Sequence, residues 1–199
     1  MKQNRTQAIP GYDYGEATVA ASPVTIEELR RLEETVGWTE DDARWLRAAA
    51  ETLVPQSERM VDAWRAKIGR QPHLSRWFAK ADGTPDDAYK AAVKCRFVRW
   101  VSDICLRPHD QDWLNYQEEI GLRHTPAKKN QTDGGQTPSV VPLRYLIAFA
   151  SVVITSVRSF LDSSDRSEEE LKAIETAWMR AVLLSIALWA RPYASEELW

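Results

Sequence analysis

The sequence has few of the residues on which several kinds of functional site depend. It contains 3 histidines, 2 cysteines and 8 glycines in 199 residues. It has no HExxH or ExxH pair and no Cys/His cluster of the kind that binds zinc or a di-iron centre. A phosphate-cradling glycine loop, a Ser/His/Asp set and a supported carboxylate pair are also missing. The sequence therefore gives no support for a zinc hydrolase, a glycine-loop nucleotide enzyme or a triad hydrolase.

Charge and hydropathy bear on partners and compartment. The net charge of −3 gives no electrostatic footprint for nucleic acid. The longest apolar runs, residues 145–157 and 181–190, are too short to span a bilayer, and the N-terminus lacks the apolar core of a signal peptide. Cys95 and Cys105 lie on one predicted helix with Cα atoms about 15 Å apart, beyond disulfide reach. We therefore expect a cytoplasmic protein with neither a membrane nor a nucleic acid as partner.

The hydrophobic pattern is helical throughout. No segment alternates with period two over a useful length, and Thr25 with Glu28 has the form of a capping box. We expect residues 1–22 to pack on the domain, residues 128–139 to form a flexible polar loop, and Glu118 and Glu119 to lie on a solvated helix face. The prediction is an all-α protein with about eight helices. The expected helices cover roughly residues 25–36, 39–53, 57–68, 74–78, 85–106, 108–124, 142–161 and 167–190.

One histidine ends an otherwise apolar stripe. Trp113, Tyr116, Ile120 and His124 follow at i, i+3, i+7 and i+11, so at a helical period they face the same way. A histidine in this position can present a ring nitrogen to a haem, or it can be a core histidine bonded to a carbonyl. His109, at a helix start, is expected to be exposed. His124 is therefore the candidate ligand among the three histidines.

Two arginines and two apolar helices leave alternatives open. Arg96 lies on a stripe with Tyr89 and Phe97, where it either extends to solvent or pairs with an anionic ligand group. Arg65 lies among apolar residues and must reach water, bind a carboxylate or donate a hydrogen bond to a ligand. The helices at 142–161 and 167–190 are either core alone, or core on one side and a subunit interface on the other.

Several long, ordered segments together resemble the protoglobins, which are single-domain haem proteins related to the globin domains of globin-coupled sensors. The resemblance covers nearly the full chain from residue 9. The segments that carry it are IPGYDYGE (9–16), PHL (72–74), DGTP (82–85), RFVRW (96–100), YQEEIGLRH (116–124), KKNQTDG (128–134), RYLIAF (144–149) and ALWARPY (187–193).

The resemblance implies a globin fold with an added N-terminal helix and an N-terminal loop. It implies a loop segment at 1–22 that packs on a haem domain at 23–199, with haem b bound through His124 as the proximal iron ligand. The propionates would be covered by the loop, gases would enter through narrow tunnels, and the last two long helices would form a homodimer. The implied cofactor contacts are Trp64, Phe97 and Phe149 on the distal side, Ile120 and Trp189 on the proximal side, and Arg96 near a propionate. Further implied contacts, without an assigned side, are Arg65, Phe78, Tyr89, Val93, Tyr116 and Leu146.

The sequence departs from this family at two positions. Arg65 stands where relatives more often have a distal tyrosine, and Thr125 stands where many have a second histidine. The implied function is reversible binding of O2, CO or NO, for gas sensing or storage. The alternative is a haem enzyme that carries out NO or peroxide chemistry or carbene transfer at the open iron site. A haem-free helical dimer used for interaction is the third hypothesis.

Overall fold

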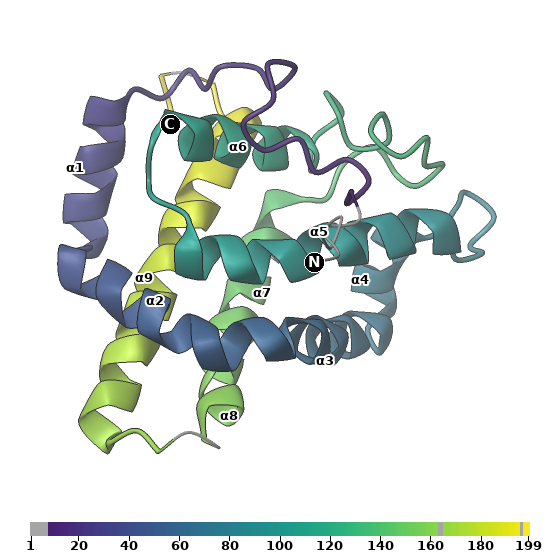
Figure 1. The fold of residues 1–199 in the computed structure, drawn as a ribbon. Coiled ribbons are helices and arrows are strands. Elements are labelled where there is room, and N and C mark those ends of the chain that lie inside the picture. The colour runs from purple at the N-terminus through teal and green to yellow at the C-terminus, as the bar shows by residue number, and fades with distance from the viewer. Residues whose placement is uncertain (1–7, 163–164, 196) are drawn as a thin grey trace, which may run out of the picture.

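The computed structural model describes residues 8–162, 165–195 and 197–199, and in these residues the chain is all-α, as predicted. Across these described ranges, the one β feature is an isolated bridge between Ala79 and Pro85. Figure 1 shows the arrangement of the helices. The elements are α1 Ile26–Val36, α2 Glu40–Leu53, η1 Val54–Gln56, α3 Ser57–Gly69, α4 Pro72–Ser75, η2 Arg76–Phe78, α5 Asp87–Leu106, α6 Gln111–Leu122, α7 Leu143–Ser156, α8 Arg158–Leu161, α9 Glu168–Ala190 and η3 Arg191–Tyr193.

Local side-chain chemistry sets several helix starts. The capping box of Thr25 and Glu28 is present, because the Thr25 hydroxyl accepts from the Glu28 N–H and the Glu28 carboxylate accepts from the Thr25 N–H. The start of α5 differs from the prediction. Pro85 was expected at the first helical position, but it pairs with Ala79, and Asp86 caps the helix by accepting from the Tyr89 N–H.

The predicted helix at 142–161 is two helices. α7 ends at Ser156, and α8 begins at Arg158. The Ser156 hydroxyl donates to the Val153 carbonyl and accepts from the indole of Trp64 at 2.7 Å. Side-chain bonds of this kind compete with the helical backbone pattern, and the sequence pattern did not reveal this break.

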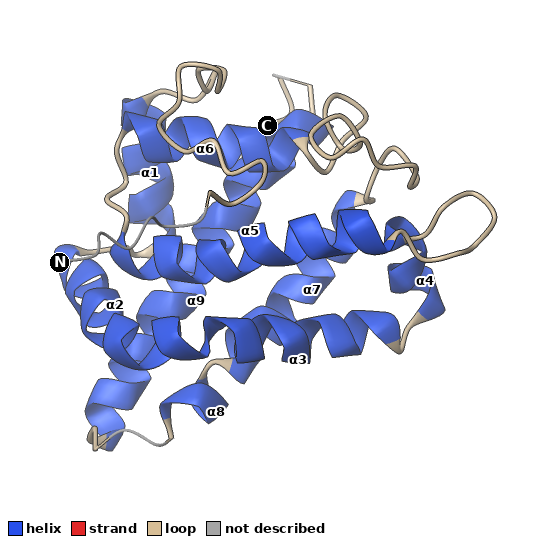
Figure 2. Cartoon of the chain, turned by 45° about the vertical axis from the view of Figure 1, so that its right-hand side comes forward, coloured by secondary structure: helices blue, strands red, loops and turns tan. Residues whose placement is uncertain are grey.

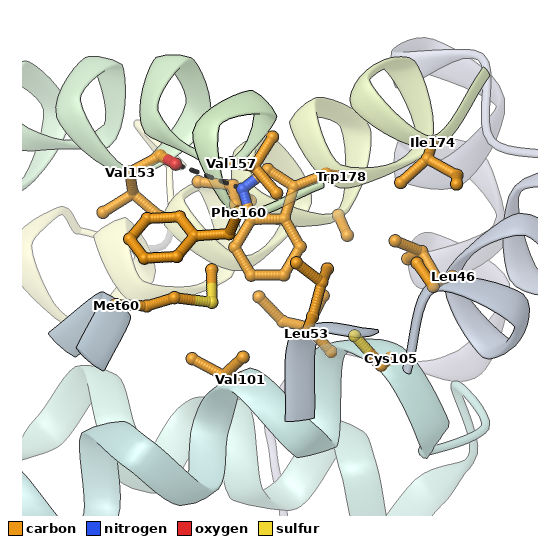
Figure 3. Packing of buried hydrophobic residues seen from close by; sticks show 14 of the residues in the cluster. Leu46, Leu53, Met60, Val101, Cys105, Val153, Val157, Phe160, Ile174 and Trp178 are labelled. Atoms are coloured by element: carbon orange, nitrogen blue, oxygen red, sulfur yellow. Dashed lines mark hydrogen bonds between the residues drawn. The ribbon is translucent and has the colours of Figure 1, made fainter. Parts of the chain in front are cut away.

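The long helices cross in two layers around the interior. α2 contacts both α5 and α9, α3 runs beside α5, and α6 and α7 both contact α9 (Figure 2). Trp178 on α9 is fully buried at the centre of the main core, where its indole donates to the Val153 carbonyl at 3.2 Å (Figure 3). A second cluster, which includes Leu29 and Trp113, holds α1 against α6 and α9.

Three polar side chains expected in solvent are buried. His109 lies between the rings of Trp38 and Trp113, and its Nδ1 is 2.7 Å from the Glu33 carboxylate. Glu118 and Glu119 are 5% and 4% exposed. Glu118 pairs with Arg191, which lies in the segment after α9 that packs on α6. Glu119 pairs with Arg123, the residue that caps the end of α6. Each prediction of exposure was wrong because the buried group has a partner: the Glu33 carboxylate for His109, and an arginine for each of the two glutamates.

The last helices are longer than their uncharged runs. Segments of 19 residues from Leu143 and 26 residues from Glu168 are long and apolar enough to cross a membrane by length and composition alone. The prediction that these segments are too short to span a bilayer was based on their uncharged runs alone. The core helices of soluble proteins pass the same test, and α9 carries the buried Trp178.

Candidate functional site

A cavity of about 220 Å³ lies in the interior between α5, α6, α7 and α9. This volume greatly exceeds the ~10–15 Å³ that one water molecule needs. His124 lines it together with all the predicted contact residues except Trp64 and Arg65. The predicted residues on its wall are Phe78, Tyr89, Val93, Arg96, Phe97, Tyr116, Ile120, Leu146, Phe149 and Trp189.

The wall of the cavity is mainly aromatic and aliphatic. Further wall residues came from outside the predicted set, and they include Trp77, Trp100, Lys129, Asp133 and Tyr145. Trp77, Lys129 and Asp133 lie in irregular or short helical segments, where hydrophobic periodicity gives no signal. A cavity with this lining suits a large, flat, apolar ligand with a few polar groups at its edge.

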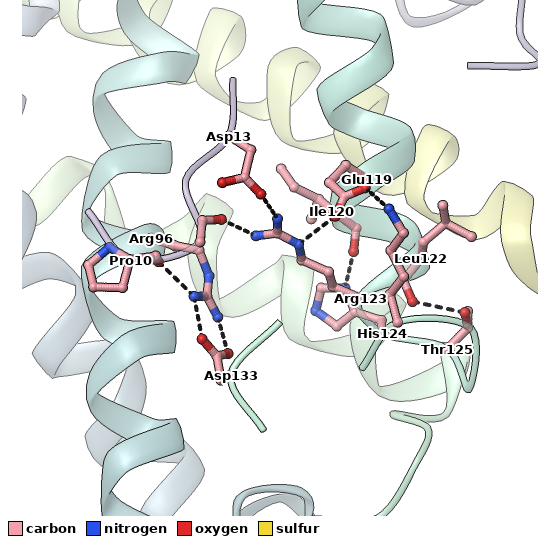
Figure 4. Close-up of polar contacts among 12 residues, drawn as sticks. Pro10, Asp13, Arg96, Glu119, Ile120, Leu122, Arg123, His124, Thr125 and Asp133 are labelled. Carbon is pink, nitrogen blue, oxygen red and sulfur yellow. Dashed lines mark hydrogen bonds and ion pairs between the residues drawn. The ribbon is translucent and has the colours of Figure 1, made fainter. Parts of the chain in front are cut away.

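His124 lies two residues beyond Leu122, the last residue of α6. Its Nδ1 lies 2.8 Å from the Ile120 carbonyl oxygen, so Nδ1–H donates, and Nε2 carries the lone pair (Figure 4). The carbonyl-bonded histidine and the metal-ligating histidine were alternatives in the sequence. In the structure His124 is bonded to a carbonyl, and this bond is compatible with metal ligation. A ligating imidazole ordinarily donates its other N–H to a carbonyl or carboxylate.

The surroundings of His124 fix its protonation and its position. Burial lowers the pKa of His124 to about 4, so the ring is neutral at neutral pH. The Val141 N–H and the Tyr193 hydroxyl both donate to the His124 carbonyl, at 2.9 and 3.0 Å. The Trp189 ring stacks on the imidazole with a centroid separation of 5.9 Å. The orientation of the ring is therefore determined by backbone, phenol and indole contacts.

Close packing of α6 on the end of α9 brings Trp189 to this position. A Cβ at Gly121 would lie 3.2 Å from the Trp189 Cα and 3.1 Å from the Pro192 ring. The indole of Trp189 donates to the buried Gln117 side chain at 2.9 Å. A larger residue at Gly121 would push α9 away from His124.

Two arginines hold loops over one side of the cavity. Arg96 forms a two-pronged ion pair with Asp133 at 2.6 and 2.8 Å and donates to the Pro10 carbonyl at 2.9 Å. Arg123 pairs with Glu119 and Asp13 at 2.9 and 3.0 Å (Figure 4). The loop at 128–139 and the N-terminal segment are thus joined to α5 and α6.

Trp64 and Arg65 lie outside the cavity wall. Trp64 is fully buried behind Phe97, with a ring separation of 5.1 Å. Arg65 is half-buried in α3, and its side chain has no ion pair or hydrogen bond within the described part of the chain. Trp64 therefore supports the wall through Phe97, and Arg65 faces elsewhere.

The comparison with protein families is decisive here. A family model described as Protoglobin matches residues 25–199. The chain belongs to the protoglobin family. Membership of this globin family implies a haem cofactor.

Solved structures support the fold of this protoglobin independently. The globin domain of the Geobacter sulfurreducens globin-coupled sensor matches with a TM-score of 0.66 and 14% identity, covering 83% of this chain and 97% of that domain. At this identity the match shows the fold alone, and it confirms the predicted globin fold. A comparison with curated proteins finds no match.

The residues of this protoglobin fit a haem. The cavity is apolar, and His124 offers one neutral imidazole to it. Among the described residues no group of three or more His, Cys, Asp or Glu side chains could hold a bare metal ion. Trp77 lines the cavity, and its Nε1 is the buried side-chain nitrogen left without a hydrogen-bond partner in the described residues. An acceptor on a bound group would satisfy that indole.

Proposed function

We propose that this protoglobin binds haem b through His124 and reversibly binds diatomic gases, O2, CO or NO, for sensing or storage. The observation that carries the proposal is the His124 geometry in an apolar cavity: Nδ1–H donates to the Ile120 carbonyl, which leaves Nε2 as the donor to iron. The haem would supply an iron with one coordination position open to a gas.

The chain would control the protonation state and orientation of the ligand. Because the pKa of His124 is about 4, protons do not compete with iron for the imidazole at neutral pH. Trp189 stacks on the ring, and the Tyr193 hydroxyl holds its backbone. These contacts would hold the imidazole in one orientation toward the iron.

The residues that we assign to the gas side favour gas binding over catalysis. Phe97 and Phe149, which we assign to the gas side, are apolar and line the cavity. Peroxide chemistry depends on a positioned acid or base near the iron, and these two residues supply none. Arg65 does not line the cavity, so we infer that it does not donate to a bound gas.

We also propose a cytoplasmic homodimer formed through α7 and α9. Ile147, Met179 and Leu183 on these helices are 54%, 38% and 42% exposed. A second copy would cover this apolar surface. Both cysteines are free thiols, which suits a reducing compartment. Sedimentation of the wild type at twice the monomer mass, and of Leu183→Glu at the monomer mass, would support the dimer.

The absorption spectrum tests haem binding. The purified protein should show an intense Soret band that shifts when CO is added to the dithionite-reduced form. His124→Ala should lose the band and regain it when imidazole is supplied, because free imidazole can replace the missing ligand. His73→Ala is the matched control, since His73 does not line the cavity. A wild-type protein without a Soret band after reconstitution would contradict the proposal and favour the haem-free dimer.

A further inference from the structure

Three cations line the cavity, and they differ in what neutralises them. Arg96 is paired with Asp133 at 2.6 Å, and Arg123 with Glu119 at 2.9 Å. Lys129 has no carboxylate within ion-pair distance among the described residues. Its ammonium donates to the Thr137 hydroxyl and, at 3.1 Å, to the Trp77 carbonyl. Of the three, Lys129 is thus bonded to neutral acceptors alone.

Burial makes this arrangement unfavourable without a counter-charge. Lys129 is 3% exposed, and a buried ammonium ordinarily has an anionic partner. The ring of Tyr89, with its centroid 4.8 Å from Nζ, gives partial compensation. Asp86 is the nearby carboxylate, but it accepts from the Tyr89 and Gln136 N–H groups at 3.1 and 3.3 Å. Burial lowers the pKa of Lys129 to about 8, which agrees with an incomplete set of partners.

The position of the ammonium is well defined. The Lys129 N–H donates to the Thr125 carbonyl at 3.0 Å. Thr137 is itself fixed, because its hydroxyl donates to the Asn130 side chain at 2.8 Å. The ammonium therefore stands at the cavity wall on a loop that begins just after His124, and little further ordering is needed for it to meet a ligand.

We propose that Lys129 is the anchor for a carboxylate of the ligand that fills the cavity, which is a propionate of the haem. The inference rests on the proposed function and adds the residue that recognises the acidic edge of the cofactor. It assigns to Lys129 the role that the family resemblance suggested for Arg96. The guanidinium of Arg96 is already neutralised by Asp133, whereas a propionate would complete the partners of Lys129.

The test compares haem with its dimethyl ester, in which both carboxylates are blocked. The full-length chain is loaded with each porphyrin, and the rate of porphyrin loss to excess apomyoglobin is measured from the Soret band. The variants are Lys129→Met, Lys129→Gln and Lys129→Arg. Lys128→Met is the matched control, because Lys128 pairs with Glu119 and does not line the cavity.

The wild type should lose the ester faster than haem, and Lys129→Met should reduce that ratio by about ten- to hundredfold, the size expected of a charge-assisted pair. Lys129→Arg should keep most of the wild-type ratio of the ester loss rate to the haem loss rate, and Lys128→Met should leave that ratio unchanged. Lys129→Gln keeps a hydrogen-bond donor, so it provides a folded variant without charge if the methionine variant misfolds. Equal ratios in the wild type and the uncharged variants would overturn the inference while leaving haem binding intact. Absence of a Soret band with either porphyrin in the wild type would instead overturn the proposed function and this inference with it.

Discussion

Replacing Asp133 by asparagine should destabilise the protein far more than the loss of a surface ion pair. The carboxylate binds both terminal nitrogens of Arg96 at 2.6 and 2.8 Å, and the two side chains are 8% and 12% exposed. Removing one partner of a buried pair leaves the other charge uncompensated, at a cost of roughly 3–5 kcal/mol. Arg96 keeps the Pro10 carbonyl at 2.9 Å and some contact with water, so we expect about 3 kcal/mol.

Equilibrium unfolding in urea measures this cost, with Arg96→Met and the double variant completing a thermodynamic cycle. The double variant should be more stable than Asp133→Asn, because no charge is left without a partner. Asp62→Asn is the control: Asp62 pairs with Lys94, but its side chain is 52% exposed, and the expected cost is below about 1 kcal/mol.

The same substitution should release the loops that cover the cavity. Arg96 joins the loop at 128–139, through Asp133, to the N-terminal segment, through Pro10. Asp133→Asn should therefore accelerate loss of a bound haem, while Asp62→Asn should not. A cost for Asp133→Asn no larger than that of Asp62→Asn would refute the reasoning, since the pair would then behave as a solvated one.

Three further outcomes are expected. Arg65→Ala should leave oxygen dissociation unchanged in stopped flow, because Arg65 does not line the cavity; a clearly faster rate would show that Arg65 donates to the bound gas. Trp178→Ala should lower the free energy of unfolding by about 3–5 kcal/mol, because it empties a fully buried site and removes the indole that donates to the Val153 carbonyl. As pH rises from 8 toward 10.5, the haem-free wild type should gain stability relative to Lys129→Met, by up to about 1.4 kcal/mol per pH unit. In that window the unfolded chain still holds the Lys129 proton, whereas the folded chain has lost it. Parallel stability curves for the two proteins would contradict a depressed Lys129 pKa.

The sequence alone was sufficient to predict most of the helices and part of the cavity wall. Helix period and capping are local, so the capping box at Thr25 and the approximate bounds of α2, α3, α5 and α9 could be predicted from short stretches of the chain. The apolar stripe that ends at His124 could likewise be predicted from the helical period of a short stretch of the chain. Tyr116, Ile120 and His124 do lie together at the cavity, while Trp113 packs in the second core with Leu29.

The tertiary structure decided which charges are buried and what neutralises them. Glu118 and His109 were expected in solvent because nothing in their own helix shows an incoming partner. Glu119 does have a partner four residues on, Arg123, but an i, i+4 pair does not by itself indicate burial. Asp133 meets Arg96 across a separation of 37 residues, and Lys129 is carried to the cavity by an irregular loop whose polar composition predicted only flexibility. Burial of a charge depends on partners that are distant in sequence and on the volume left between helices. These quantities exist only once the chain has folded, and here they distinguish an arginine already neutralised by the protein from a lysine available to a ligand.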